Sequence, residues 1–114
     1  MERRFRLNKA SDFKRVRQFG RTYSHPLLVL IVNWNELKLS RVGIIAGKSL
    51  GNAVKRNRIK RQIRACMNSM LSEIHGNWDI VLIPRPAIIG SEFSIIENSM
   101  RNIFHRSGLI EQNE

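Results

Sequence analysis

The sequence predicts a small α+β domain, an α/β sandwich in which a mixed sheet of about four strands carries three helices on one face. Apolar residues recur at helical spacing in three stretches, and shorter continuous apolar runs between turn residues indicate strands. A strand, a helix and a strand in succession imply a crossover that brings the last strand beside an earlier one. The chain of 114 residues has room for one domain, 1–114, with a basic arm at 1–7 and a short tail at 109–114.

The first helix is expected over about Lys9 to Phe19. Asn8 or Ser11 can cap its start, and Gly20 follows its end. Phe13 lies on its apolar side. Two interpretations of this ring stay open, because an aromatic at such a position is either a core anchor or a platform for an unpaired base.

Continuous apolar runs mark the strands. Leu27 to Val32 is typical of a buried strand and is followed by the turn-like residues Asn33 to Glu36. Thr22 to Ser24 adds a short edge strand, and Leu39 to Ala46 is a second main strand. Trp78 to Ile83 is a further buried strand, since prolines stop it directly afterwards.

The second helix, about Asn52 to Ile74, divides into two faces. Four apolar residues recur at steps of four, three and four: Ile59, Ile63, Cys66 and Met70. Polar residues at the same steps form the opposite face: Asn57, Arg61, Arg64 and Asn68. Asn52 can cap its start and Gly76 can close its end. In the last helix Ser91 is the expected cap, and Gly108 ends the helix.

Charge is concentrated at the start of the second helix. From Lys48 to Arg64 the chain carries seven Lys or Arg and no acid. Cations in the first turns of a helix oppose its dipole at a cost of a few tenths of a kcal/mol each. A functional reason is therefore expected, namely a bound anion, although a solvated helix face is the alternative.

The composition of the whole chain agrees with an anionic partner. The formal charge is +11 and the sequence pI is about 11.3, so nucleic acid is the expected partner, with an anionic membrane surface or an acidic protein as alternatives. A hydrophobic content of 42% excludes a disordered basic tail. No apolar run approaches the roughly 18 residues of a membrane span, and no signal-peptide core follows the start. A lone cysteine, Cys66, is expected to be a reduced core residue, which favours the cytoplasm.

Motifs for independent catalysis are absent from the sequence. The acids are scattered singly, which gives weak support for an Mg²⁺ nuclease site, and one Cys with three separated His does not make a zinc site. The segment from Gly47 to Ser49 lacks the earlier glycine of a nucleotide-binding P-loop. If the chain serves a reaction, the reacting groups are expected elsewhere.

Several motifs together resemble the protein subunit of bacterial ribonuclease P. The central one is the Arg56-Asn57-Arg58 motif, with Gly51 to Val54 before it and Ile59 to Arg64 after it. The flanking motifs agree in order and spacing: Leu7-Asn8-Lys9, Asp12-Phe13 with Val16 and Gly20, Arg41-Val42-Gly43, Asp79-Ile80-Val81 and Arg85-Pro86. The resemblance covers about residues 5 to 106.

The resemblance implies a fold like domain 2 of ribosomal protein S5, with a left-handed βαβ crossover through the basic helix. It also implies that the catalyst is the RNA subunit, which holds Mg²⁺ and hydrolyses precursor tRNA to free the mature 5′ end. The expected partners are that catalytic RNA, bound 1:1, and precursor tRNA, with no membrane. No catalytic residue or metal ligand is expected in this chain.

The resemblance also implies two sets of binding residues. One set faces the catalytic RNA: Lys48, Ser49, Lys55, Arg56, Asn57, Arg58, Lys60, Arg61 and Arg64. The other lines a cleft for the single-stranded 5′ leader: Phe13, Arg17 and Ile31. At Arg17 and Ile31 some relatives have an aromatic residue. A non-enzymatic RNA-binding or ribosome-associated protein with the same fold, and a stand-alone nuclease, remain alternatives.

Overall fold

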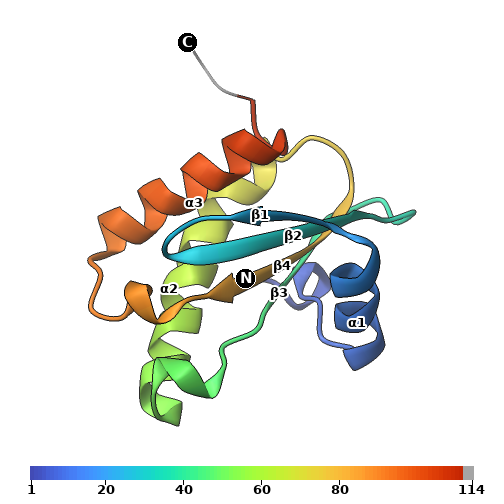
Figure 1. The fold of residues 1–114 in the computed structure, drawn as a ribbon. Helices are drawn as coiled ribbons and strands as arrows, with labels where there is room; N and C mark the ends of the chain where they lie inside the picture. Colours follow the sequence, from blue (N-terminus) through green and yellow to red (C-terminus); the bar gives the residue numbers. More distant parts are fainter. Residues whose placement is uncertain (112–114) are drawn as a thin grey trace.

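A mixed sheet of four strands forms the centre of the protein, whose computed structural model describes residues 1–111 (Figure 1). The strand order is β1-β2-β4-β3, with these bounds: β1 Arg21–Ser24, β2 Leu28–Trp34, β3 Arg41–Ile44 and β4 Trp78–Pro84. β2 pairs antiparallel with β1 and β4, whereas β3 pairs parallel with β4. The predicted mixed sheet is therefore confirmed.

Three α-helices cover this sheet: α1 Ala10–Phe19, α2 Ala53–Met70 and α3 Phe93–Ser107. Figure 1 shows α1 on one side of the sheet and α2 and α3 on the other. The prediction that all helices pack on one face is wrong. β2 is apolar at successive positions, and successive side chains of a strand point to opposite faces, so both faces need a cover.

The two covered faces have cores of different size. On the α2 and α3 side, alternate β2 residues such as Leu28 and Leu30 are fully buried with Ile63 and Phe104. On the α1 side the core cluster of residues 1–111 has four buried members, namely Leu7, Val16, Ile31 and Val81. Most of the hydrophobic stabilisation therefore comes from the side that carries α2.

Helix α2 begins as predicted. Its cap is Asn52, whose side-chain Oδ1 accepts a hydrogen bond from the Lys55 backbone N–H at 3.0 Å. It ends earlier than expected, at Met70, and a 3₁₀ turn at Leu71–Glu73 continues the chain. α2 joins the parallel neighbours β3 and β4, which confirms the crossover, while its left-handed sense stays a prediction.

Other boundaries differ by a few residues from the prediction. Asn33 and Trp34 belong to β2 and not to a turn, because their partners in β4 extend the ladder. Neither Asn8 nor Ser11 caps α1; Lys9 occupies the cap position and makes no side-chain bond there. Glu92, not Ser91, precedes α3.

Residues near both ends of the described chain pack against the rest of the domain. Leu7 is 4% exposed, and its N–H donates to the Val42 carbonyl at 2.8 Å, so the arm is anchored beside β3. Gly108 ends α3 in the left-handed conformation with φ 82°. Leu109 and Ile110, the first two residues of the predicted tail, are buried in the core. The rest of that tail, 112–114, lies outside the described residues.

The burial of α2 predicts different changes in stability when two apolar residues of this helix are replaced. Ile63 is fully buried, so Ile63→Ala should lower the free energy of unfolding by about 2–5 kcal/mol. Val54 is 75% exposed, so Val54→Ala should leave it nearly unchanged. Denaturant unfolding of both variants measures the difference, and equal losses would contradict this placement of the helix.

Candidate nucleic-acid interface

The apolar stripe of α2 is buried and turns the cations of the helix outward. Ile59, Ile63, Cys66 and Met70 are all buried, as the periodicity predicts. Six of the nine residues expected to face RNA are exposed: Lys48, Ser49, Lys55, Asn57, Arg58 and Arg61. The other three, Arg56, Lys60 and Arg64, are half-buried. Within residues 1–111, none of the cations among the nine forms an ion pair with a carboxylate.

Lys48 and Ser49 lie in a short 3₁₀ helix, Lys48–Leu50, between β3 and α2. Leu50 is fully buried and anchors this turn, which leaves its two polar neighbours exposed. Gly51 then has φ 107°, a conformation that favours glycine, and leads the chain into the α2 cap. Lys48 and Ser49 therefore extend the polar, cationic surface beyond the start of α2.

A groove with a volume of about 730 Å³ runs along α1. It is lined by Ala10, Phe13, Lys14, Arg17, Gln18 and Ile45. An aromatic ring and two cations on one wall suit an unpaired nucleotide, whose base can stack while its phosphate is neutralised. Of the three residues expected in the leader cleft, Phe13 and Arg17 line this groove.

Ile31 does not line it. Its side chain is 6% exposed and packs with Val16 and Val81 beneath α1. Ile31 points to the face of the sheet on which α1 lies, but α1 covers its side chain. Ile31 thus belongs to the core that supports α1, and its contact with the leader stays a prediction.

Phe13 lies directly against β3, because Gly43 beneath its ring has no side chain. A Cβ atom on Gly43 of β3 would overlap with the Phe13 ring. Glycine at this position thus lets the ring lie directly on the strand. The ring is half-buried, so the core and stacking interpretations of Phe13 are both compatible with its position.

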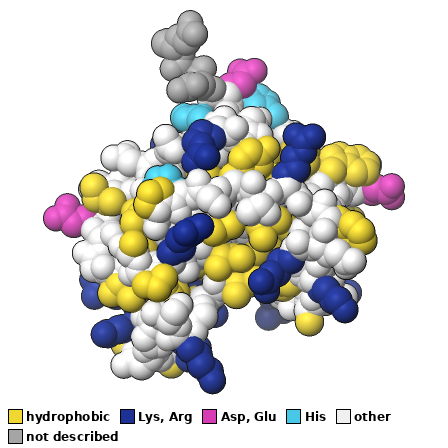
Figure 2. All heavy atoms as spheres, viewed as in Figure 1, with side chains coloured by type: hydrophobic (Ala, Val, Ile, Leu, Met, Phe, Trp, Pro, Cys, Tyr) yellow, Lys and Arg dark blue, Asp and Glu magenta, His cyan; other side chains and the backbone are white. Residues whose placement is uncertain are grey.

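A second hollow, of about 300 Å³, joins the groove to the cationic face of α2. Phe13 lines both hollows, and Arg64 of α2 lines the second together with Arg3, Arg6 and Asn8. The sequence indicated the arm only as a basic segment, and its density of arginines was the available signal. Figure 2 shows hydrophobic side chains between α2 and α1 with Lys and Arg on both sides of them, while acidic side chains lie at the margins of the view.

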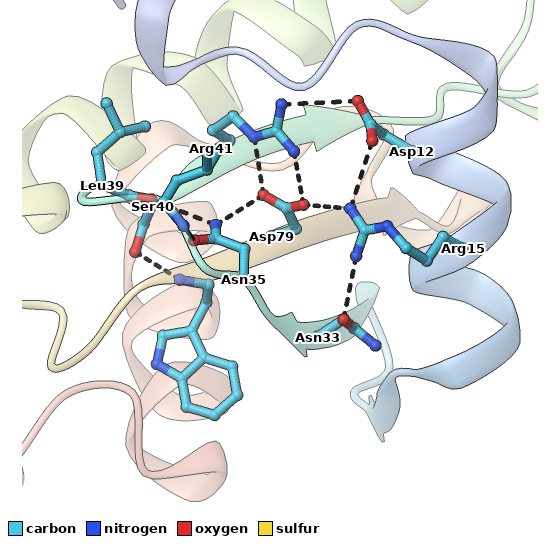
Figure 3. Close-up of polar contacts among 10 residues, drawn as sticks. Asp12, Arg15, Asn33, Asn35, Leu39, Ser40, Arg41 and Asp79 are labelled. Carbon is cyan, nitrogen blue, oxygen red and sulfur yellow. Dashed lines mark hydrogen bonds and ion pairs between the residues drawn. The ribbon is translucent and has the colours of Figure 1, made fainter.

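A buried acid on β4 organises the polar contacts under α1 (Figure 3). The Asp79 carboxylate is fully buried and accepts hydrogen bonds from Arg15, from Arg41 at 2.9 and 2.7 Å, and from Asn35 at 2.9 Å. Burial raises the pKa of Asp79, but the hydrogen bonds from Arg41, Arg15 and Asn35 outweigh it and place the pKa below the ordinary value. Asp79 is therefore an ionised anchor for two guanidinium groups.

The sequence did not predict this cluster. Asp79 was the only acid inside a buried strand, which was the available signal, because such a charge needs partners. Its partners come from α1, β3 and the segment after β2, and nothing in the local pattern identifies them.

Three further findings concern properties outside this surface. Burial is the main cause that raises the pKa of the Cys66 thiol, to about 11, so this cysteine is a core residue as predicted. Within residues 1–111, no group of three or more His, Cys, Asp or Glu side chains is placed to hold a metal ion. No helix in that range has the length and apolar character needed to cross a membrane.

Comparisons with known proteins agree along nearly the whole chain. A family model described as Ribonuclease P matches residues 1–108. The ribonuclease P protein component of Herpetosiphon aurantiacus is 39% identical over 114 residues, which cover 100% of this chain and 93% of the relative. A Staphylococcus aureus RNase P protein mutant with defective mRNA degradation activity has a TM-score of 0.90 at 32% identity, with 96% of this chain and 93% of that chain covered. The Thermotoga maritima RNase P protein has a TM-score of 0.82 at 27% identity, with 89% and 96% covered.

The fold and the surface define a class of RNA-binding α+β protein, in which an unneutralised cationic helix lies next to an aromatic-lined groove. The similarity of sequence and structure then gives the family. The chain belongs to the ribonuclease P protein family.

The lowered pKa of Asp79 predicts a specific loss of stability in acid. Because the folded-state pKa lies below the unfolded value of about 3.9, the unfolded chain binds more protons in that range, and stability falls as the pH drops through the folded-state pKa. Asp79→Asn removes this contribution and should flatten the decline below about pH 4. Unfolding free energies of wild type and variant against pH measure it. Glu36→Gln, at an exposed acid, is the control and should follow the wild type.

Proposed function

We propose that the cationic face of α2 binds the catalytic RNA of ribonuclease P and that the α1 groove binds the 5′ leader of precursor tRNA. Membership of the family makes the chain the protein component of ribonuclease P, the ribonucleoprotein that processes tRNA 5′ ends. The finer proposal is an assignment of two RNA strands to two surfaces of one domain.

The observation that carries the proposal is the junction of the two surfaces. Phe13 lines both hollows, and Arg64 projects from α2 into the hollow beside it. An RNA bound along α2 and a single strand bound along α1 therefore approach each other at this point. Cations between two polyanions lower their mutual repulsion, so the protein would allow cleavage at a lower Mg²⁺ concentration.

The catalytic groups are proposed to belong to the RNA. Asp79, the buried acid beneath α1, is fully engaged by two guanidinium groups and an amide. The cationic face is a poor match for Mg²⁺, which prefers carboxylate and water oxygens. The metal ions required for cleavage would accordingly be held by the RNA subunit and its substrate.

Two further properties belong to the proposal. One copy of the protein has one α2 face and one groove, which supports a 1:1 complex with the catalytic RNA. A buried, reduced Cys66 supports the cytoplasm as its location, where precursor tRNA is made and thiols stay reduced.

The direct test is processing of precursor tRNA at low Mg²⁺ by a bacterial catalytic RNA, with and without the protein. Cleavage only when both are present is the expected result. Tight RNA binding without any stimulation of cleavage would instead favour a general RNA-binding role. Cleavage by the protein alone would place catalysis in its own side chains.

The α2 assignment predicts a change in salt dependence. Arg61 is exposed and forms no ion pair within residues 1–111, so Arg61→Ala should weaken binding to the catalytic RNA and lower the slope of log affinity against log salt by about 1. Arg101→Ala removes the same charge from α3, where Arg101 pairs with Glu73 at 3.1 Å, and is the matched control. Equal slopes for the two variants would remove Arg61 from the interface.

A further inference from the structure

The charged residues beneath α1 form a closed ring of ion pairs. Asp79 pairs with Arg15 and with Arg41 at 2.7 Å, and Asp12 pairs with the same two arginines at 3.4 and 3.6 Å. Asp12 and Arg15 belong to α1, whereas Arg41 belongs to β3 and Asp79 to β4. Figure 3 shows the four side chains converging from these elements. The ring therefore joins the helix to two strands.

The ring lies directly beside the position where Phe13 touches the sheet. Arg41 and Asp79 are opposite each other in the parallel pair β3 and β4, and Asp79 is opposite Asn33 in β2. Arg15 donates a hydrogen bond to Asn33 at 3.1 Å, so α1 is attached to all three strands along this row. Gly43, on which the Phe13 ring rests, lies two residues beyond Arg41 on the same face of β3.

These contacts determine the rotation of α1 about its own axis as well as its distance from the sheet. In α1, Phe13 follows Asp12 directly and projects about 100° further around the helix axis. A rotation of α1 about its axis would thus move Phe13 away from Gly43, and Arg17, one turn later, would move with it. The apolar contacts of α1 involve few buried residues and have no direction, whereas hydrogen-bonded ion pairs have one.

Stability alone is a weak reason for such a ring. Buried ion pairs are on average no more stabilising than apolar side chains of similar volume, because desolvation offsets their attraction. β4 is otherwise apolar on this face, with Val81 and Ile83 in the core under α1. The ring can define an orientation of α1 that apolar residues would not define, and this is a more specific reason for its presence.

We infer that the ring of Asp12, Arg15, Arg41 and Asp79 is a positioning device for the leader groove, which holds α1 at the angle at which Phe13 and Arg17 bind single-stranded RNA. The inference rests on the proposed function of the groove. The four side chains are positioning residues and need no contact with the RNA themselves.

Asp12→Asn tests the inference, because the loss of a negative charge and the loss of positioning would change RNA affinity in opposite directions. Removing a carboxylate near RNA raises the net positive charge and by itself strengthens binding. If the ring positions α1, the variant instead binds a long-leader precursor less tightly. The assay uses the protein in complex with the catalytic RNA and compares two precursors, one with a long leader and one with its leader trimmed to a single nucleotide. The ratio of the two affinities should fall roughly five- to tenfold, comparable to the loss of one stacked base.

Two controls separate positioning from folding and from charge. Glu73→Gln breaks the exposed ion pair with Arg101, changes the charge by the same amount and should keep the wild-type ratio. Thermal unfolding shows whether Asp12→Asn is folded at the assay temperature; Asp12 is partly exposed, so we expect that it is. In a Phe13→Ala background, Asp12→Asn should reduce the ratio little further, because both changes act on the same contact.

The outcomes are distinct. The inference is supported if the ratio of long-leader to trimmed-leader affinity falls in Asp12→Asn but not in Glu73→Gln. The affinities for the trimmed precursor and for the catalytic RNA should stay unchanged. An unchanged or increased ratio overturns it, as does an equal loss for both precursors. If the wild-type protein itself shows no dependence on the leader, the proposed function of the groove fails, and the inference fails with it.

Discussion

Burial of one face of α2 is the contact on which the rest of the structure depends. Ile63, Cys66 and Met70 lie in the main core against the sheet and α3. Because the helix repeats every 3.6 residues, this contact determines which residues point away from the core. The arginines and asparagines of α2 form the outer face for that reason. Folding and the proposed RNA binding thus use opposite faces of the same helix, and the repulsion among the cations is offset by the apolar burial behind them.

The α1 side is built differently. Its core is small, and α1 is held there by the close approach of Phe13 to Gly43 and by hydrogen-bonded charges around Asp79. The hydrogen-bonded ion pairs among these contacts are directional, which suits their proposed role in keeping an aromatic ring at a defined angle. The cationic face and the groove meet at the hollow lined by Arg64 and Phe13. The two surfaces proposed to bind RNA therefore have different supports within one domain.

Local patterns explain which features could be predicted from the sequence. The two faces of α2 and its Asn52 cap depend on residues within a few turns of one another, and both were correct. The Asp79 cluster could not be found in this way, because Arg15 is 64 residues and Arg41 is 38 residues from Asp79 in sequence. The position of Ile31 also depends on where α1 packs. The resemblance supplied the groove itself, since periodicity alone left the role of Phe13 open.

If the two surfaces bind two different RNA strands, site-directed crosslinking shows it most directly. Gln18→Cys places a thiol in the groove and Ala65→Cys places one on the exposed face of α2. Cys66 is buried with its pKa raised to about 11, so a photoreactive label attaches to the introduced cysteine. In the complete complex, the label on α1 should crosslink to the leader of precursor tRNA and the label on α2 to the catalytic RNA. The same strand crosslinked from both positions, or the opposite assignment, would contradict the account.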